Sequence, residues 1–276
     1  MLTHARPAVS QSESRLTAKL TSALAHIGRT IGQRLEPLGK SLLVKAAEEE
    51  DERRAIDDIN WSPIADAAAT ELVTVARDGA EQVLAALGIE AGTDQIFASA
   101  EHYARMRSAE LVGKTWDEHG ELFDNPDADM AISDTVRDEI RAAVADAVES
   151  GDSAAELGDR IRSLPSFSPE RATLIARTEI IRAHGQGQLA ALKASGVVEK
   201  KGWSTSTEPT VCDECQANED EGAVDIEDEF PSGDDAPPAH PACMCALIAV
   251  LEEHDESDDE DEDEDESQGG DADSDD

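Results

Sequence analysis

Apolar residues recur every three or four positions along most of the chain up to Gly196, which is the spacing of one face of an α-helix. The most regular run predicts a helix that Gly88 closes, and it consists of Ile64, Ala68, Leu72, Val75, Gly79, Val83 and Leu87. A less regular run predicts a second helix, through Ile96, Ala100, Tyr103, Arg107 and Leu111. We therefore expect a predominantly α-helical body.

Three further helices carry signals at their ends. The stripe Ile132, Val136, Ile140, Val144 and Val148 has Ser133 or Asp134 as its expected N-cap and Gly151 after its end. The capping box Ser153-x-x-Glu156 starts a short helix that presents Leu157, Ile161 and Leu164 before Pro165 stops it. Ser168 and Pro169 start the last of the three, which contains Leu174, Ile175, Ile180 and Ile181, runs to about Ala194 and ends at Gly196.

The pattern changes after Gly196. Residues 197–203 are short, β-branched and bounded by turns, which favours a strand. Val211 and the run Ala246–Val250 could pair beside it in a small antiparallel sheet. The aromatic content of only 3% argues against a large sheet. The predicted fold class is α+β: a helical body with a small C-terminal antiparallel β module.

The N-terminal stretch is basic and amphipathic. Residues 1–46 carry seven Lys or Arg against two acids, and an apolar stripe predicts a helix broken near Pro37: Leu16, Leu20, Leu24, Ile27, Ile31 and Leu35. Its partner could be nucleic acid, an acidic protein surface or the chain's own acidic body. High salt weakens binding driven by phosphate charge, so among external partners a protein that takes the leucine stripe is favoured over DNA.

The net charge of −40 indicates a protein that functions in concentrated salt. Residues 252–276 hold 17 of the 63 acids and no Lys or Arg, and composition predicts a disordered tail there. The remaining chain still has 46 acids against 23 basic residues. Such a surface repels itself in ordinary salt, whereas at about 1 M salt the screening length is only about 3 Å. We interpret the acidity as that of an extreme halophile or its virus; a DNA mimic is the alternative.

All four cysteines lie close together in sequence, as Cys212-x-x-Cys215 and His240-Pro-Ala-Cys243-Met-Cys245. Two such groups offer five candidate ligands, Cys212, Cys215, His240, Cys243 and Cys245, to a structural zinc ion that needs four. Our preferred set omits Cys245. Unligated thiols, disulfides and a His240/Cys243 base–nucleophile pair are the alternatives. Neither a signal peptide in Met1–Gln11 nor a membrane span is recognisable, so we expect reduced thiols.

A family resemblance rests on four blocks of sequence in order. They are Arg171-Ala172-x-x-Ile175-Ala176-Arg177-Thr178-Glu179, Gly196-x-Val198-x-x-x-Gly202-Trp203-Ser204-Thr205, Cys212-x-x-Cys215 and Pro237-Pro238-x-His240-Pro241-x-Cys243-x-Cys245. Together they resemble the phage Mu F-like minor head proteins, over roughly Ser133 to Val250. Two positions depart from the family pattern: Met244 stands where an arginine is usual, and His184 where an asparagine is common.

The resemblance implies a structural virion protein attached at or near the portal vertex and needed for head assembly. Its partners would be the portal protein and possibly the major capsid or scaffold protein, and its location the virion, with the host cytoplasm during assembly. A weak DNA contact through the basic N-terminal stretch and no membrane contact are expected. No enzymatic reaction is implied.

An enzyme is the alternative function: a metal-dependent nuclease or modifying toxin that uses the metal or Arg177, Glu179 and His184. We favour Arg177, Glu179 and Arg182 as an ion network that fixes their helix to the small sheet. The acids of 216–235 are expected in a flexible loop, which does not suit two-metal catalysis. A zinc-ribbon nucleic-acid binder is a third possibility, disfavoured by the surrounding acids.

These features divide the chain into four parts. Residues 1–47 form the basic N-terminal arm, 48–165 the helical body, 166–251 the Mu F-like C-terminal module with the Cys/His site, and 252–276 the acidic tail.

Overall fold

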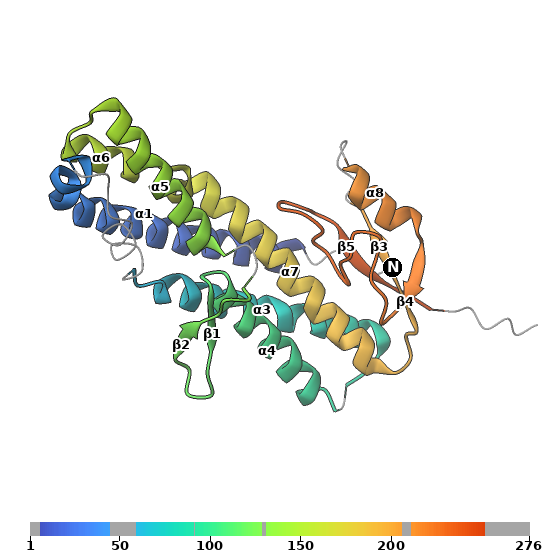
Figure 1. Cartoon of the computed structure of the whole chain (residues 1–276). Coiled ribbons are helices and arrows are strands. Elements are labelled where there is room, and N and C mark those ends of the chain that lie inside the picture. Colours follow the sequence, from blue (N-terminus) through green and yellow to red (C-terminus); the bar gives the residue numbers. More distant parts are fainter. Residues whose placement is uncertain (1–5, 45–58, 91, 129–130, 206–210, 252–276) are drawn as a thin grey trace, which may run out of the picture.

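A computed structural model describes residues 6–44, 59–90, 92–128, 131–205 and 211–251. The chain is mostly helical, with a small antiparallel sheet near its C-terminal end, as the sequence predicts (Figure 1). The helices are α1 Arg6–Val44, α3 Ser62–Leu87, α4 Asp94–Glu110, α5 Ile132–Ser150, α6 Ala154–Arg162, the 3-10 helix η1 Pro165–Phe167, α7 Pro169–Ser195 and α8 Asp213–Asp220. The predicted acidic tail, 252–276, lies outside the described residues. No helix in the described ranges is long and apolar enough to cross a membrane.

Helices α1 to α7 form the helical layer of the molecule. Helix α7 is its centre and packs against α3, α1 and α4. Its closest approach is to α3, where glycines replace side chains. A methyl carbon added at Gly187 would lie 1.9 Å from the Ala76 carbonyl oxygen, and one at Gly79 would lie 2.4 Å from the His184 carbonyl oxygen. Real contacts are never that short, so both positions require glycine for the two backbones to meet.

Helix α1 runs along the helical layer and buries its leucine stripe against α3, α6 and α7 (Figure 1). The stripe therefore packs on the chain's own body, one of the three partners considered from sequence. Arg15 and Lys19 each donate a hydrogen bond to the buried carboxylate of Glu71 in α3, at 2.9 Å. Burial raises the pKa of Glu71, but these bonds and the charges of the two cations outweigh it, and the pKa is lowered overall. The predicted break near Pro37 is wrong, because α1 continues to Val44.

Most of the predicted helix ends are confirmed. Ser153 accepts a hydrogen bond from the Glu156 backbone N–H while Glu156 accepts one from the Ser153 N–H, which completes the capping box. Gly88, Gly151 and Gly196 have φ of 69°, 71° and 66°. The expected cap of α5, Ser133 or Asp134, is wrong by two or three residues: the helix already includes Ile132, because the Ala131 carbonyl accepts the first hydrogen bonds, from Asp134 and Thr135.

The C-terminal sheet has the strand order β4-β3-β5. The strands are β4 Ala223–Asp225, β3 Lys200–Ser204 and β5 Ala246–Val250, and both outer strands pair antiparallel to β3. Lys201 pairs with Ala249 on one side and with Val224 on the other. The predicted pairing of Val211 is wrong: Val211 precedes the helix cap at Cys212, and the third strand is β4 instead.

The segment between the two cysteine groups is not the flexible loop expected from its composition. It contains α8 and β4, and its Phe230 ring packs edge-on against Trp203 with the centroids 5.1 Å apart. Buried Asn218 accepts a hydrogen bond from the Ser232 N–H and donates one to the Ser232 hydroxyl, both at 2.9 Å. These contacts across the segment order it despite its acidity.

A second, two-stranded sheet was not predicted. Strand β1, Lys114–Trp116, pairs antiparallel with β2, Leu122–Asp124, directly after α4. Asp117 shapes the connecting turn by accepting backbone hydrogen bonds from His119 and Glu121. The indole N–H of Trp116 donates to the Arg105 carbonyl, which attaches the hairpin to α4.

Candidate metal centre

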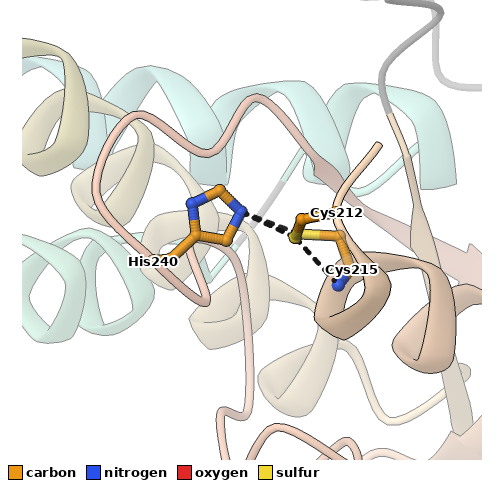
Figure 2. A group of neighbouring side chains, drawn as sticks. All are labelled: Cys212, Cys215 and His240. Carbon is orange, nitrogen blue, oxygen red and sulfur yellow. Dashed lines mark hydrogen bonds between the residues drawn. The ribbon is translucent and has the colours of Figure 1, made fainter. Parts of the chain in front are cut away.

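The two cysteine groups meet at the start of α8. Cys212 is the N-cap of this helix, and its sulfur accepts a hydrogen bond from the Cys215 backbone N–H at 3.4 Å. His240 and Cys243 come from the loop before β5, and Cys245 directly precedes that strand. Figure 2 shows the His240 ring pointing at the Cys212 sulfur from the opposite side of the site. The fold thus brings all five predicted residues to one place.

The distances between these side chains are those of a ligand cluster. Nε2 of His240 lies 3.1 Å from the Cys212 sulfur and 3.2 Å from the Cys215 sulfur, and the sulfurs of Cys215 and Cys243 are 3.6 Å apart. Ligands about 2.3 Å from a tetrahedral ion are about 3.7 Å apart. A disulfide would need about 2.05 Å, and the four cysteines are free in the structure.

His240 presents the nitrogen that can bind a metal. Its Nδ1 lies 2.9 Å from the Pro241 carbonyl oxygen, which can only accept, so Nδ1 carries the proton and the lone pair of Nε2 can accept an S–H hydrogen bond or bind a metal ion. Burial lowers the pKa of His240, but the carbonyl and the neighbouring sulfurs outweigh this effect, and the pKa is raised overall. A backbone carbonyl on the far nitrogen is a common support for a metal-bound imidazole.

The cysteines differ in their acidity. The Cys215 N–H lowers the pKa of Cys212, and burial raises the pKa of Cys215 to about 12. A hydrogen bond from the Cys245 thiol lowers the pKa of Cys243 to about 5, and the same bond raises the pKa of Cys245. Cys212 and Cys243 are therefore the sulfurs that carry negative charge most readily, as metal-binding thiolates do.

Two overlapping groups of ligand atoms could hold a metal ion. Cys212, Cys215 and His240 form one, and Cys215, Cys243 and Cys245 form the other; within each, all ligand atoms lie within 4.8 Å of one another. Cys215 belongs to both. A single four-coordinate ion shared between them could take Cys212, Cys215, His240 and Cys243, with Cys245 as the fifth candidate.

Helix α7 holds the loop before β5, which carries His240 and Cys243. The Thr178 hydroxyl accepts a hydrogen bond from the Ala242 N–H at 3.0 Å, where Ala242 has a φ of 62°. Gly185 faces the Pro237 carbonyl oxygen, which would lie 2.8 Å from an added methyl carbon. Thr178 was not singled out from the sequence, although it lies within the Arg177-Thr178-Glu179 block. It positions the segment between His240 and Cys243.

Arg177, Glu179 and Arg182 of α7 do form ion pairs, but with α1 and α4 and not with the sheet; the ion pair from α7 to the segment after β4 is made by Lys193, with Glu227. Both carboxylate oxygens of Glu179 accept from Arg107 of α4, at 2.9 and 3.0 Å. Arg177 pairs with Glu13 of α1 at 3.2 Å, and Arg182 approaches Glu179 at 3.8 Å. The predicted link to the sheet is wrong: the network joins α7 to α4 and α1.

His184 is not part of that network. Burial lowers its pKa to about 4, so the ring is neutral at pH 7. Its Nε2 is buried and has no hydrogen-bond partner among the described residues. Arg107 holds Glu179 on both oxygens, and Nε2 of His184 makes no hydrogen bond to it.

Comparison with protein families matches residues 138–248 to the family described as Phage Mu protein F like protein. Residues 138–248 are thus similar to the Phage Mu F-like proteins. The match confirms the resemblance that the sequence motifs carry, and it spans the chain from α5 to β5, including all five candidate ligands. The family points to a phage head morphogenesis protein. No curated protein and no solved structure matches the chain.

Proposed function

We propose that this protein is a minor structural protein of the head of a tailed virus, associated with the portal and needed for head assembly. The observation that carries the proposal is the Mu F-like match, which covers the central helix α7 and most of the Cys/His module. By the Cys/His module we mean the part of the chain after α7, with the β4-β3-β5 sheet, α8 and the five candidate ligands. Assembly takes place in the host cytoplasm, and the protein remains in the virion. The portal protein is its principal partner, with the major capsid or scaffold protein as a second.

A zinc ion with a structural role completes this proposal. The ligand atoms are sulfur and imidazole nitrogen, the donors that zinc prefers in structural sites. Its four ligands would be Cys212, Cys215, His240 and Cys243, and Cys245 could replace either His240 or Cys243. The ion would join the start of α8 to the loop before β5, which Thr178 attaches to α7. Four protein ligands fill the coordination sphere, which favours a structural role over metal-dependent hydrolysis.

We propose that the portal protein binds a surface other than the leucine stripe of α1. That stripe is buried against the chain's own helices. Arg15 and Lys19 are likewise engaged by Glu71, which removes support for a DNA contact through them. We place the contact on the exposed surface of the helical layer, where a partner can bind without separating α1 from the core.

The acidic surface supports a halophilic host. The whole chain carries a net charge of −40, and repulsion at this density is screened only at high salt. We expect the far-UV circular dichroism signal of folded protein to fall below about 1 M salt and to return when salt is restored. A fold that is indifferent to salt would contradict the halophilic assignment without affecting the head-protein proposal.

Purified virions test the principal proposal directly. Quantitative mass spectrometry should find the protein at a few copies for each portal ring, far below the major capsid protein. A virus with the gene deleted should give no DNA-filled heads, and a copy supplied in trans should restore them. Normal heads without the protein would contradict the proposal. Metal-dependent cleavage of DNA that survives Cys212→Ser but is lost in Glu179→Gln, while circular dichroism shows that this variant is still folded, would favour the enzyme alternative instead.

A further inference from the structure

Exposed apolar side chains gather on one short segment of the molecule. Among the described residues, five large hydrophobic side chains are exposed, and three of them lie within residues 244–251. Met244 is 43% exposed, Ile248 37% and Leu251 59%. The other two, Phe123 and Val197, lie at separate sites on the surface. Ile248 and Leu251 point to opposite faces of the extended segment, so these side chains border its edge on both sides.

The same segment contains an unprotected strand edge. Strand β5 is one of the two outer strands of the sheet, and β3 is its only partner strand in the part of the chain that the structure describes. Its sequence, Ala246-Leu247-Ile248-Ala249-Val250, has no charge, no proline and no bulge. Those are the features that usually keep an edge from pairing with another chain. The opposite edge, β4, is protected: it has three residues and ends in Asp225.

A cavity lies directly beside this edge. It has a volume of about 360 Å³ and is bounded by β5 and the residues before it, by α7 and by the start of α1. Its walls include Cys245, Leu247, Ile181 and Val9, with the neutral His184 among them. An apolar side chain from a strand added to β5 could enter it, so the edge and the cavity form one surface.

We propose that a second copy of this chain pairs with β5, antiparallel and centred on Ile248, to form a continuous six-stranded sheet across a two-fold axis. In this register Ile248 faces its counterpart, Ala246 faces Val250 and Leu247 faces Ala249. Each large side chain on either side of the centre is thus opposite an alanine. A small side chain opposite a large one fills the space between paired strands without overlap, so the strand is complementary to a second copy of itself.

The same register places an exposed side chain at the cavity. Alternate residues of a strand point to opposite faces, and buried Leu247 marks the face of β5 toward the helical layer. Leu251 of the second copy lies opposite Cys245 in this register and points to that same face. It therefore meets the cavity beside β5, where its exposed surface would be covered. This match with the second copy's own Leu251 favours self-pairing over an unrelated strand.

Charge sets the conditions for pairing. Two copies, each with a net charge of −40, repel strongly at low salt. In an antiparallel pair the two copies of Leu251 lie at opposite ends of the shared strands. The dimer is therefore expected at molar salt, and its dissociation constant should rise as salt is lowered.

Sedimentation velocity of the full chain at molar KCl, over a range of protein concentrations, measures the pairing. The wild type should show a monomer–dimer equilibrium. Ile248→Lys and Ile248→Glu each place two like charges opposite each other at the centre, and each should weaken the dimer at least about 100-fold. An equimolar mixture of the two variants should recover a heterodimer to within about 10-fold of wild type, since opposite charges now face each other.

Phe123→Lys is the matched control. It adds the same charge at an exposed apolar residue on the β1–β2 hairpin, and it should leave the dissociation constant unchanged. Unchanged circular dichroism and zinc content show that each Ile248 variant is folded. A wild type that stays monomeric at all concentrations and salts overturns the proposal. Homodimers of Ile248→Lys as stable as wild type overturn it too. Neither result bears on whether the protein is a virion component.

Discussion

The helical layer and the Cys/His module are held together in different ways. In the helical layer, α7 and α3 meet over glycine and alanine, so their backbones lie in direct contact along a continuous apolar core. The module has fewer apolar residues, chiefly Trp203, Phe230 and Leu247, and it buries polar groups such as Lys201 and Asn218. The first region relies mainly on close packing, with a few buried carboxylates in ion pairs such as Glu179 with Arg107, whereas the second depends on side-chain hydrogen bonds and, we propose, on a metal ion.

Metal removal should separate the two regions most strongly. Cys215→Ser removes the sulfur common to both ligand groups, and the lost coordination amounts to about 10–16 kcal/mol in structural zinc sites. We expect loss of about one equivalent of zinc by mass spectrometry. Hydrogen exchange should then show that residues 200–250 lose protection while α3 and α7 keep theirs.

Cys245→Ser is the control for the ligand set. If Cys212, Cys215, His240 and Cys243 hold the ion, this variant keeps close to one equivalent of zinc. Wild-type protein that contains less than about half an equivalent, with a folded module, would show that the module needs no metal.

Within the helical layer, the largest single effect is expected at the ion pair between α4 and α7. Glu179→Gln leaves the mostly buried guanidinium of Arg107 with only the partly exposed Glu110 as a countercharge, which should cost about 3–5 kcal/mol of unfolding free energy. Glu110→Gln removes the other, half-exposed carboxylate on Arg107 and should cost less than about 0.5 kcal/mol. Urea unfolding at constant high salt measures both. Equal losses would mean that the Glu179 pair is not special.

The contact of α7 with α3 gives the next effect. Gly187→Ala places a methyl group against the Ala76 carbonyl, and the backbones must separate, at a cost of about 3 kcal/mol. In Gly158→Ala the nearest atom is the flexible end of Arg162, so the helix should be unchanged or stabilised by about 0.5–1 kcal/mol. Melting temperatures at matched salt compare the two. A tolerated Gly187→Ala would refute the close backbone approach.

The smallest effect is a pH dependence within the helical layer. The pKa of His184 is about 4 when folded and 6.5 in its ordinary state, so between these values the unfolded chain binds a proton that the folded chain does not. Stability from this residue is complete above pH 6.5 and is lost as pH falls through that window, by about 2–3 kcal/mol. In His184→Asn, the urea concentration at the unfolding midpoint should change less between pH 7 and pH 4 than it does in the wild type. Parallel curves would contradict the shift.

The sequence predicted local structure well and distant contacts poorly. Helix stripes and end signals such as Ser153 with Glu156 or Gly196 depend on residues a few positions apart, and they were confirmed. The partner of Glu179 is Arg107, and Thr178 binds the N–H of Ala242. Neither contact follows from local spacing, because each joins residues more than sixty positions apart.

The acidic segment between the cysteine groups shows why composition misled the prediction. Most of its acids are exposed and say little about order, but Glu219 and Asp235 accept hydrogen bonds from Thr205 and Gln186. Further contacts fix the backbone: Asn218 with Ser232, Phe230 with Trp203 and the Lys201 ammonium with the Asp235 carbonyl. For the Cys/His site, by contrast, ligand identity and spacing were enough to predict which five residues gather. The geometry of the site then depended on α8, which its composition did not indicate.

The position of α7 between α1, α3 and α4 limits what can be cut from this protein. The family match begins at residue 138, after three of the helices that cover α7. A fragment that starts there would expose Ala172, Ala176 and Ile180, which are fully buried in the whole chain. The recognisable part is thus not a portable unit, and truncated versions made for crystallisation or binding assays should aggregate unless they retain residues 6–110.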